Sequence, residues 1–479
     1  MPFKPYIRLS QHDEKQELKG QNMKFFKKQL FLDFEQPTWE LNPVLFIMHQ
    51  ILDCRPDIIL LAKACFPKAK DESKSVIGRD GMTLEQIIRC AIFKQCNRMN
   101  YEQLSLATND SKLGRAFMKM ENKPRFSAQA LQENISKIST EVLDQIHQAI
   151  ALYAIELGVD DGKKVRPDST VIKANIHYPT NAALLGDCVR VACRLLRQSK
   201  DLLAIVRFRC YAKASKKTVF KIVNTKGNNA KQKRIPLFRK LLRHTKCCEN
   251  QVIEAIAILG SCALDDKVRE KQRKKLLQKL QDLLPRMQQI QNVTYRREIL
   301  NEQVPVADKL FSIFEDHADC ISKGSREAEF GHKVNLTVGD SHFVFDCILE
   351  RGNPADTGYY PKTIDNLKNN LGIVPESIAS DGGYASKANR DYALSKNIKN
   401  VVFNKVKGAL QNVASSKKME TLLKKWRSGV EAMISNFKRG LNAGICTWKG
   451  WEAFEKFVMW NVITFNLRII ARSVLQQLA

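Results

Sequence analysis

Apolar residues recur at helical spacing through the first third of the chain. Thr83 followed by Gln86 predicts a capping box, and the apolar positions from Leu84 to Ile92 then repeat along one helix face. Three further parts are expected to be helical: Pro43 to Phe66, Tyr101 to Ala107 and Phe126 to Leu157. Short helices at tight turns are compatible with a helix-turn-helix DNA reader, and equally with a bundle that only packs.

The pattern changes after Gly158. Lys164 to Ile172 places β-branched residues around Asp168 and predicts a strand. From Asn181 to about Cys320, leucines and isoleucines return to 3.6-residue spacing, which predicts a long helical segment.

The last third predicts strands followed by helices. His332 to Val338 and His342 to Leu349 flank Gly339-Asp340-Ser341, which favours a hairpin. Two more strands and two closing helices are expected: Ile373 to Ala379, Lys399 to Phe403, Lys417 to Lys438 and Trp451 to Leu475. The apolar stripe that includes Phe454 and Phe457 should be core. This order is typical of an α/β domain with a mixed sheet whose first strand is separated in sequence from the rest.

These changes divide the chain into five predicted segments. An N-terminal arm with short helices precedes an all-helical DNA-binding domain, and a basic helical insertion splits the α/β core. The expected bounds are 1–75 for the arm, 76–158 for the helical domain, 159–185 for the first part of the core, 186–325 for the insertion, and 326–479 for the rest of the core with the closing helices.

Composition narrows the class of partner. The chain has 479 residues, with 78 Lys and Arg against 50 Asp and Glu, so its net charge is +28. The electrostatic field of so positive a chain favours polyanionic partners, nucleic acid first and anionic membrane second. The thirteen cysteines include no CxxC pattern, which argues against zinc ribbons and thioredoxin chemistry. Without a secretory signal or an apolar run long enough for a bilayer, we expect a cytoplasmic protein with reduced thiols and no membrane partner.

The positive charge is concentrated in one segment. Residues 207–246 contain fourteen Lys and Arg and no Asp or Glu. A charged run is often only a solvated face, but an acid-free run of this length favours a surface that follows phosphates, with Phe208, Tyr211 and Phe220 interleaved. The DNA contacts expected there are Lys216, Lys217, Lys233 and Arg234.

Three acidic residues occupy positions suited to metal-dependent chemistry. Asp168 lies within the first strand, and Asp381 ends a later strand before two glycines that permit a tight turn. Glu431 shares a helix face with Arg427 and Lys438, because spacings of four and seven residues are about one and two turns. Converged carboxylates repel one another and need cations, and Mg²⁺ prefers oxygen ligands.

Two such ions, about 3.5 to 4 Å apart, activate a water or 3′-hydroxyl and stabilise the leaving oxygen of a phosphodiester. Arg427 and Lys438 would then hold DNA phosphates. Other interpretations stay open: Asp168 as a strand-end cap, Asp381 as a turn residue, and Arg427 with Glu431 as a surface ion pair. Further acids also remain candidates: Asp160, Asp161, Asp187, Asp346 and Asp356.

In combination, these residues resemble an insertion-sequence DDE transposase of the group with a Tyr-Arg-Glu-Lys signature. Arg427, Glu431 and Lys438 match Arg-x3-Glu-x6-Lys, Asp381 opens an Asp-Gly-x-Tyr motif, and the first acid lies in Asp168-Ser169-Thr170-Val171. Residues 175–180 (Asn-Ile-His-Tyr-Pro-Thr), 329–333 (Glu-Phe-Gly-His-Lys) and 352–356 (Gly-Asn-Pro-Ala-Asp) resemble stretches common in such transposases. The similarity runs from about Thr83 to the C-terminus, apart from the basic insertion.

The resemblance implies an RNase H-like core in which Asp168, Asp381 and Glu431 hold two Mg²⁺ ions, for which Mn²⁺ should substitute. It also implies an N-terminal region that recognises terminal inverted repeats, cleavage at transposon ends, and joining of the 3′-hydroxyl to target DNA in a homo-oligomeric complex. The protein would be nucleoid-associated when bound to DNA.

Two features depart from the signature. Lys424 stands where the group has Tyr, although Trp426 is close by. Pro167 precedes Asp168, and because a central strand rarely tolerates proline, we expect either a bulge or a strand that begins at Asp168. His177 is expected to make a structural hydrogen bond in a loop.

Two other classes of protein stay open. One is a catalytically silent, transposase-derived DNA-binding protein. The other is a basic RNA-binding or structural helical protein, which explains the charge but leaves the acid motifs to coincidence.

Overall fold

The computed structural model describes residues 39–66, 81–120, 126–322, 327–405 and 410–478. The predicted N-terminal arm up to residue 38 lies outside the described residues. The chain divides into two compact units: Met1–Asp161 with Met459–Ala479, and Gly162–Val458. The five segments predicted from the sequence stay a prediction.

The first unit is helical in its described part. Its elements are η2 (Trp39–Leu41), α1 (Pro43–Cys54), α2 (Pro56–Leu60), η3 (Leu61–Cys65), α3 (Leu84–Cys96), α4 (Tyr101–Asp110), α5 (Lys112–Phe117), α6 (Ala128–Ser136), α7 (Thr140–Glu156) and the end of α15 (Trp451–Leu478). The predicted capping box is confirmed, since the Thr83 hydroxyl accepts from the Gln86 backbone N–H at 3.2 Å and the Gln86 side chain accepts from the Thr83 N–H at 3.0 Å.

The second unit contains a mixed sheet, as expected. Its strands are β1 (Lys164–Ala174), β2 (Asp319–Ile321), β3 (Glu329–Val338), β4 (Val344–Leu349), β5 (Ser377–Asp381), β6 (Asn400–Asn404) and β7 (Ile445–Cys446). The central order is β2-β3-β1-β5-β6, with β4 also on β3 and β7 also on β1. Strand β3 is antiparallel to β1, β2 and β4, whereas β1, β5 and β6 run parallel. The α/β class is therefore confirmed.

Proline in the first strand is accommodated by the way this strand is paired. Strand β1 begins at Lys164, so the expectation that it begins at Asp168 is wrong. Pairing with β5 involves Lys164 and Val165, and Pro167 comes after it, opposite Thr337 of β3. The register shift lies across β3 and β4, beside Thr337, and not in β1. The pairing of β1 with β5 has therefore ended before Pro167, so no backbone N–H is required on that side of the strand.

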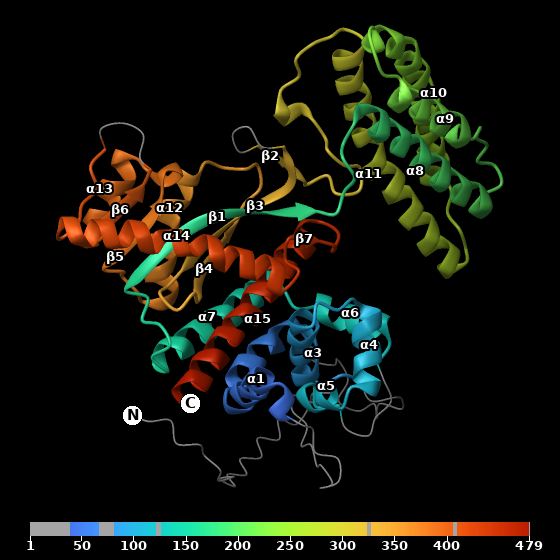
Figure 1. Cartoon of the computed structure of the whole chain (residues 1–479). Helices are drawn as coiled ribbons and strands as arrows, with labels where there is room; N and C mark the ends of the chain where they lie inside the picture. Colours follow the sequence, from blue (N-terminus) through green and yellow to red (C-terminus); the bar gives the residue numbers. More distant parts are fainter. Residues whose placement is uncertain (1–38, 67–80, 121–125, 323–326, 406–409, 479) are drawn as a thin grey trace. The chain divides into compact units, whose positions relative to one another are not determined.

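Helices cover both faces of this sheet. Helix α14 (Lys417–Gly440) lies along β6, β5 and β1 (Figure 1). Its Leu423 packs with Ala379 and Val402. The opposite face meets α12 (Asp356–Leu371), whose Thr363 bonds to Asn335 of β3. Neither α12 nor α13 (Lys387–Ser395) was predicted from the sequence.

The predicted helical insertion is a bundle. It consists of α8 (Asn181–Leu202), α9 (Ala212–Asn224), α10 (Ala230–Ser261) and α11 (Lys267–Glu298), followed by η4 (Val306–Asp308). The four long helices share one apolar core, in which the periodic leucines of α11, Leu276, Leu280 and Leu283, are buried. The helical prediction is confirmed from Asn181 to Glu298. It is wrong for the remainder up to Cys320, which is irregular apart from η4 and ends in the first residues of β2.

Helix α15 is long and apolar enough to cross a membrane by length and composition, contrary to the expectation that the chain has no such segment. Its most apolar window is 72% buried in the fold, which is typical of a core helix. The predicted core positions Phe454, Phe457 and Val458 are buried.

Candidate active site

The three predicted acids meet at one guanidinium group. Arg427 Nη2 lies 3.1 Å from Asp168 Oδ2 and 3.7 Å from Asp381 Oδ2, and Arg427 Nη1 lies 3.4 Å from Glu431 Oε1. Asp168 comes from β1, Asp381 from the end of β5, and Glu431 from α14. The fold therefore gathers these side chains from three elements that are far apart in the sequence.

The four side chains of the cluster differ in their exposure to solvent. The Arg427 side chain is 5% exposed and that of Asp168 15%, whereas Asp381 is 44% and Glu431 69% exposed. A carboxylate as buried as Asp168 requires a cation, and Arg427 supplies it. The solvent-facing side of the cluster consists of carboxylate oxygens that a ligand can reach.

Helix α14 places Arg427 through its apolar stripe. Leu423, Val430, Met433 and Phe437 are buried along one side of this helix, and Arg427 lies on the same stripe. Glu431, one turn further on, is exposed, and Lys438 is half-buried. The predicted contact of Arg427 with DNA phosphate stays a prediction, since the guanidinium here is directed at the carboxylates.

A second set of contacts fixes α14 next to the acids. The Arg166 guanidinium lies 4.4 Å from the Trp426 ring centre, and its Nη1 donates to the Trp426 carbonyl at 2.5 Å. The Trp426 ring N–H donates to Asp340 at 2.7 Å, and Lys164 pairs with Asp340 at 2.9 Å. A Cβ on Gly429 would lie 2.9 Å from Arg166 Nη1, so the absence of a side chain there lets Arg166 approach α14. The sequence does not single out Arg166, because an arginine in a strand carries no distinctive signal.

The Asp-Gly-x-Tyr motif links Asp381 to β1, the strand that carries Asp168. A Cβ on Gly382 would lie 2.6 Å from the Lys405 carbonyl oxygen, so the chain passes too close for any larger residue. Tyr384 is buried, and its hydroxyl donates to Asn335 at 2.6 Å and lies 2.8 Å from the Ser169 hydroxyl. Burial raises the pKa of Tyr384 well above its usual range, so the phenol stays neutral.

The other motif stretches make structural contacts. A Cβ on Gly331 would lie 2.1 Å from the Ile172 carbonyl oxygen, which explains glycine at this point of β3. Lys333 pairs with Asp356 at 3.1 Å and donates to the Pro354 carbonyl at 2.7 Å. The stretches 329–333 and 352–356 are therefore tied to each other, and Asp356 is already paired with a lysine.

Two further predicted residues pair away from this cluster. His177 Nε2 lies 3.3 Å from Asp187 Oδ2, and Asp187 also pairs with Arg190 at 2.6 Å; the predicted loop hydrogen bond of His177 stays a prediction. Asp346 accepts a hydrogen bond from Asn366 at 3.1 Å. Asp160 and Asp161 precede β1 and belong to the first unit.

The donor set fits a hard cation. All three acids offer carboxylate oxygens, the ligands that Mg²⁺ prefers. Among the described residues, no group of three or more His, Cys, Asp and Glu is already arranged as a metal site. Arg427 is the cation that joins the acids in this structure.

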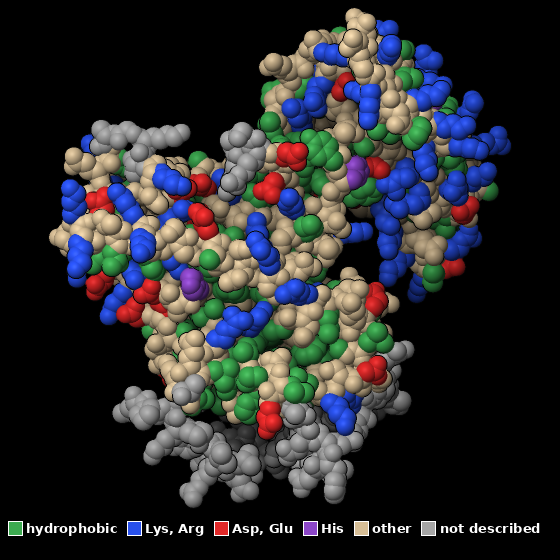
Figure 2. Space-filling view, viewed as in Figure 1, with side chains coloured by type: hydrophobic (Ala, Val, Ile, Leu, Met, Phe, Trp, Pro, Cys, Tyr) green, Lys and Arg blue, Asp and Glu red, His purple; other side chains and the backbone are tan. Residues whose placement is uncertain are grey.

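Basic side chains gather on the bundle, as Figure 2 shows. Lys216, Lys217 and Lys233 are exposed, and Arg234 is half-buried with a hydrogen bond to the Thr225 carbonyl. Of the three aromatic residues expected among the basic ones, Phe220 is 69% exposed. Phe208 and Tyr211 pack against the bundle core, so the expectation that they lie on the phosphate-binding surface is wrong. The three exposed lysines are thus accessible to phosphates.

One segment of the second unit matches a known protein family. Residues 315–467 match the transposase DDE domain family. This segment is therefore similar to a transposase DDE domain. The matched segment includes Asp381, Arg427, Glu431 and Lys438. The match supports the resemblance to insertion-sequence DDE transposases that the sequence motifs indicate. Asp168 precedes the matched segment, on the other side of the bundle in the sequence. No curated protein and no solved structure shows a significant match to the chain.

Proposed function

We propose that this chain is a DNA transposase that cleaves phosphodiesters at the terminal inverted repeats of its element and joins the freed 3′-hydroxyl to target DNA. The observation that carries the proposal is the meeting of Asp168, Asp381 and Glu431 at Arg427, together with the transposase domain match. The first two acids lie on β1 and β5, which are paired, and the third lies on a helix packed against both strands, in support of an RNase H-like core.

Asp168, Asp381 and Glu431 would hold two divalent ions, Mg²⁺ or Mn²⁺. Bound there, the ions supply activation of a water or 3′-hydroxyl and stabilise the leaving oxygen. Arg427 pairs with the largely buried Asp168 and holds the three acids near one another. Lys438, two turns beyond Glu431 on α14, would bind a phosphate of the DNA.

DNA binding is shared between the two units in this proposal. In the first unit, α3, α4 and α5 follow one another with tight turns, as in helix-turn-helix readers, and we assign them to the terminal repeats. The bundle carries exposed Lys216, Lys217 and Lys233, which would follow the backbone of either duplex. A homo-oligomer would bring two ends together, and the working protein would lie on the nucleoid.

The test is cleavage of a labelled duplex that carries the inverted repeats flanking the reading frame, with Mg²⁺ or Mn²⁺. Wild type should nick at the repeat boundary, and Glu431→Gln should bind the duplex but not cut it. Glu452→Gln is the matched control, because Glu452 is exposed at the start of α15 and pairs with Lys456.

Cutting by Glu431→Gln at the wild-type rate would remove Glu431 from the site. Tight binding to the repeats without cleavage by any of the three proteins would favour the alternative, a catalytically silent DNA-binding protein.

A further inference from the structure

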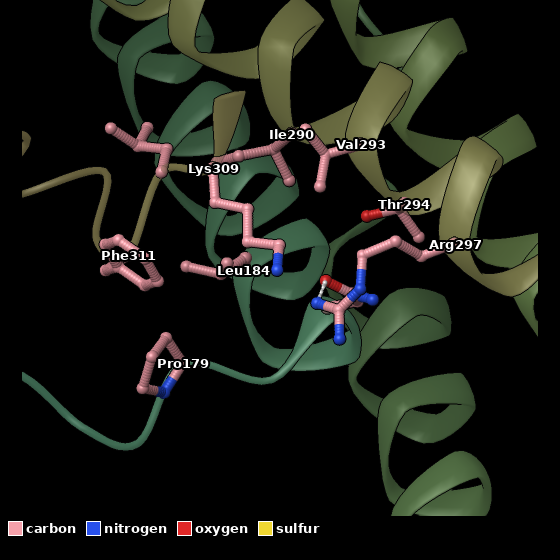
Figure 3. Close-up of a pocket in the computed structure, with 10 residues that line it drawn as sticks. Pro179, Leu184, Ile290, Val293, Thr294, Arg297, Lys309 and Phe311 are labelled. Carbon is pink, nitrogen blue, oxygen red and sulfur yellow. Dashed lines mark hydrogen bonds between the residues drawn. The ribbon is translucent and has the colours of Figure 1, made fainter. Parts of the chain in front are cut away.

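A small notch lies where α8 begins, beside the last turns of α11 and the segment after η4 (Figure 3). Its volume is about 20 Å³, enough for one water molecule or one ligand oxygen. The polar and ring residues that line it are Pro179, Asn181, Thr294, Arg297, Lys309 and Phe311. Pro179 belongs to the stretch 175–180 that the sequence singled out, and the proposed chemistry gives this stretch no role.

One buried hydroxyl in the notch has no partner. Thr294 is 1% exposed, and its Oγ1 has no hydrogen-bond partner among the described residues. In Figure 3 this oxygen points into the space that Lys309 and Arg297 also face. A buried hydroxyl without a partner is costly, so this one is placed to donate to a ligand oxygen.

Two cations flank the hydroxyl. Arg297 lies three residues after Thr294 on the same side of α11, and its Nη1 donates to Asn181 Oδ1 at 3.2 Å. Asn181 in turn donates to Glu298 at 2.6 Å, which directs its amide oxygen to Arg297. Within the described part of the chain, neither Arg297 nor Lys309 forms an ion pair with a carboxylate. The notch therefore presents two cationic side chains that no carboxylate among the described residues pairs with directly.

The start of α8 adds to this field. Thr180 caps the helix by accepting from the Ala183 N–H at 3.1 Å, and the first turn contains no acidic residue. A helix of 22 residues presents partial positive charge and free N–H groups at this end.

We propose that this notch binds a phosphate group, and that in the transposase proposed above, on which this second step rests, the phosphate belongs to the DNA backbone. One phosphate oxygen enters the notch and accepts from the Thr294 hydroxyl, and Arg297 and Lys309 pair with the outer oxygens. The site fixes a point of the duplex at the junction of β1 and the bundle, whereas the exposed lysines of α9 and α10 make diffuse contacts.

The first experiment measures binding of inorganic phosphate to the full chain by calorimetry. Arg297→Met and Lys309→Met should each weaken binding by about tenfold or more, since each removes a charge-assisted hydrogen bond. Thr294→Val should weaken it as well, and Thr294→Ser, which keeps the hydroxyl, should restore it. Lys271→Met, on an exposed position of α11, is the charge-matched control and should bind like wild type.

The second experiment measures duplex binding against salt without cleavage, so it does not depend on catalytic activity. Arg297→Met and Lys309→Met should each reduce the slope of log K against log salt by about 0.9, as expected for one lost phosphate contact. Lys271→Met should leave the slope unchanged.

The proposed site would be overturned if the Arg297, Lys309 and Thr294 variants bound both phosphate and duplex as the Lys271→Met control does. Loss of phosphate binding with unchanged duplex binding would overturn the DNA assignment and leave a site for free phosphate. Failure of Glu431→Gln to abolish cleavage would instead count against the proposed catalytic function, and the binding slopes would be unaffected.

Discussion

The central prediction concerns the cation that joins the acids. Replacing Arg427 by Met keeps a long apolar side chain in the stripe of α14 and removes the charge. Both Arg427 and Asp168 are largely buried and lie 3.1 Å apart, and breaking such a pair costs about 3 to 5 kcal/mol. The contacts to Asp381 and Glu431 are longer and their carboxylates are largely hydrated, so each adds about 0 to 1 kcal/mol.

We expect Arg427→Met to lower the free energy of unfolding of the second unit by about 3 kcal/mol, at the lower end of the range because Asp168 keeps some access to water. The assay is urea unfolding followed by tryptophan fluorescence, with and without Mg²⁺. Mg²⁺ should stabilise the variant more than the wild type, because the carboxylates then lack their own cation.

The control is Lys399→Met, which removes an exposed lysine 3.9 Å from Glu376 and should change stability by less than about 0.5 kcal/mol. An Arg427→Met variant as stable as this control would contradict the role given to Arg427, and so would equal stabilisation of wild type and Arg427→Met by Mg²⁺.

Three further changes test other parts of the second unit. Gly331→Ala should lower the free energy of unfolding by at least about 2 kcal/mol, because its Cβ would meet the Ile172 carbonyl oxygen at 2.1 Å; a urea midpoint equal to wild type would contradict this. Trp426→Phe should cost about 1 kcal/mol by removing the hydrogen bond to Asp340 and should slow cleavage without weakening duplex binding; equal loss of both would point to unfolding instead. Burial lowers the pKa of His332 below its usual value, so the stability that neutral His332 contributes is complete above about pH 6.5 and is lost as the pH falls through the lower folded pKa. Melting temperatures at pH 7.5 and 5.5 should therefore differ more for wild type than for His332→Gln, and an identical pH dependence would exclude this role.

Features that depend on neighbouring residues were predictable from the sequence. The capping box at Thr83 requires residues three apart, and the hairpin of β3 and β4 requires a turn between two apolar strands. The spacing of Arg427 and Glu431 by one helical turn likewise follows from helix geometry. Local order of this kind indicated the α/β class, the helical insertion and the face that the acidic helix presents.

Features that depend on distant residues needed the tertiary structure. Asp168 and Arg427 are 259 positions apart, and no periodicity within β1 or α14 indicates that they touch. The same holds for Arg166 and Trp426, which are 260 positions apart and whose contact fixes α14. It also holds for the Thr294 notch, whose lining comes from three separated segments. Side-chain patterns report which face of an element is buried, whereas the partner buried against it is decided by packing of the whole chain. The sequence alone therefore indicated the candidate acids and most of the elements, though not α12 or α13, whereas the sharing of one arginine by the three acids follows only from the fold.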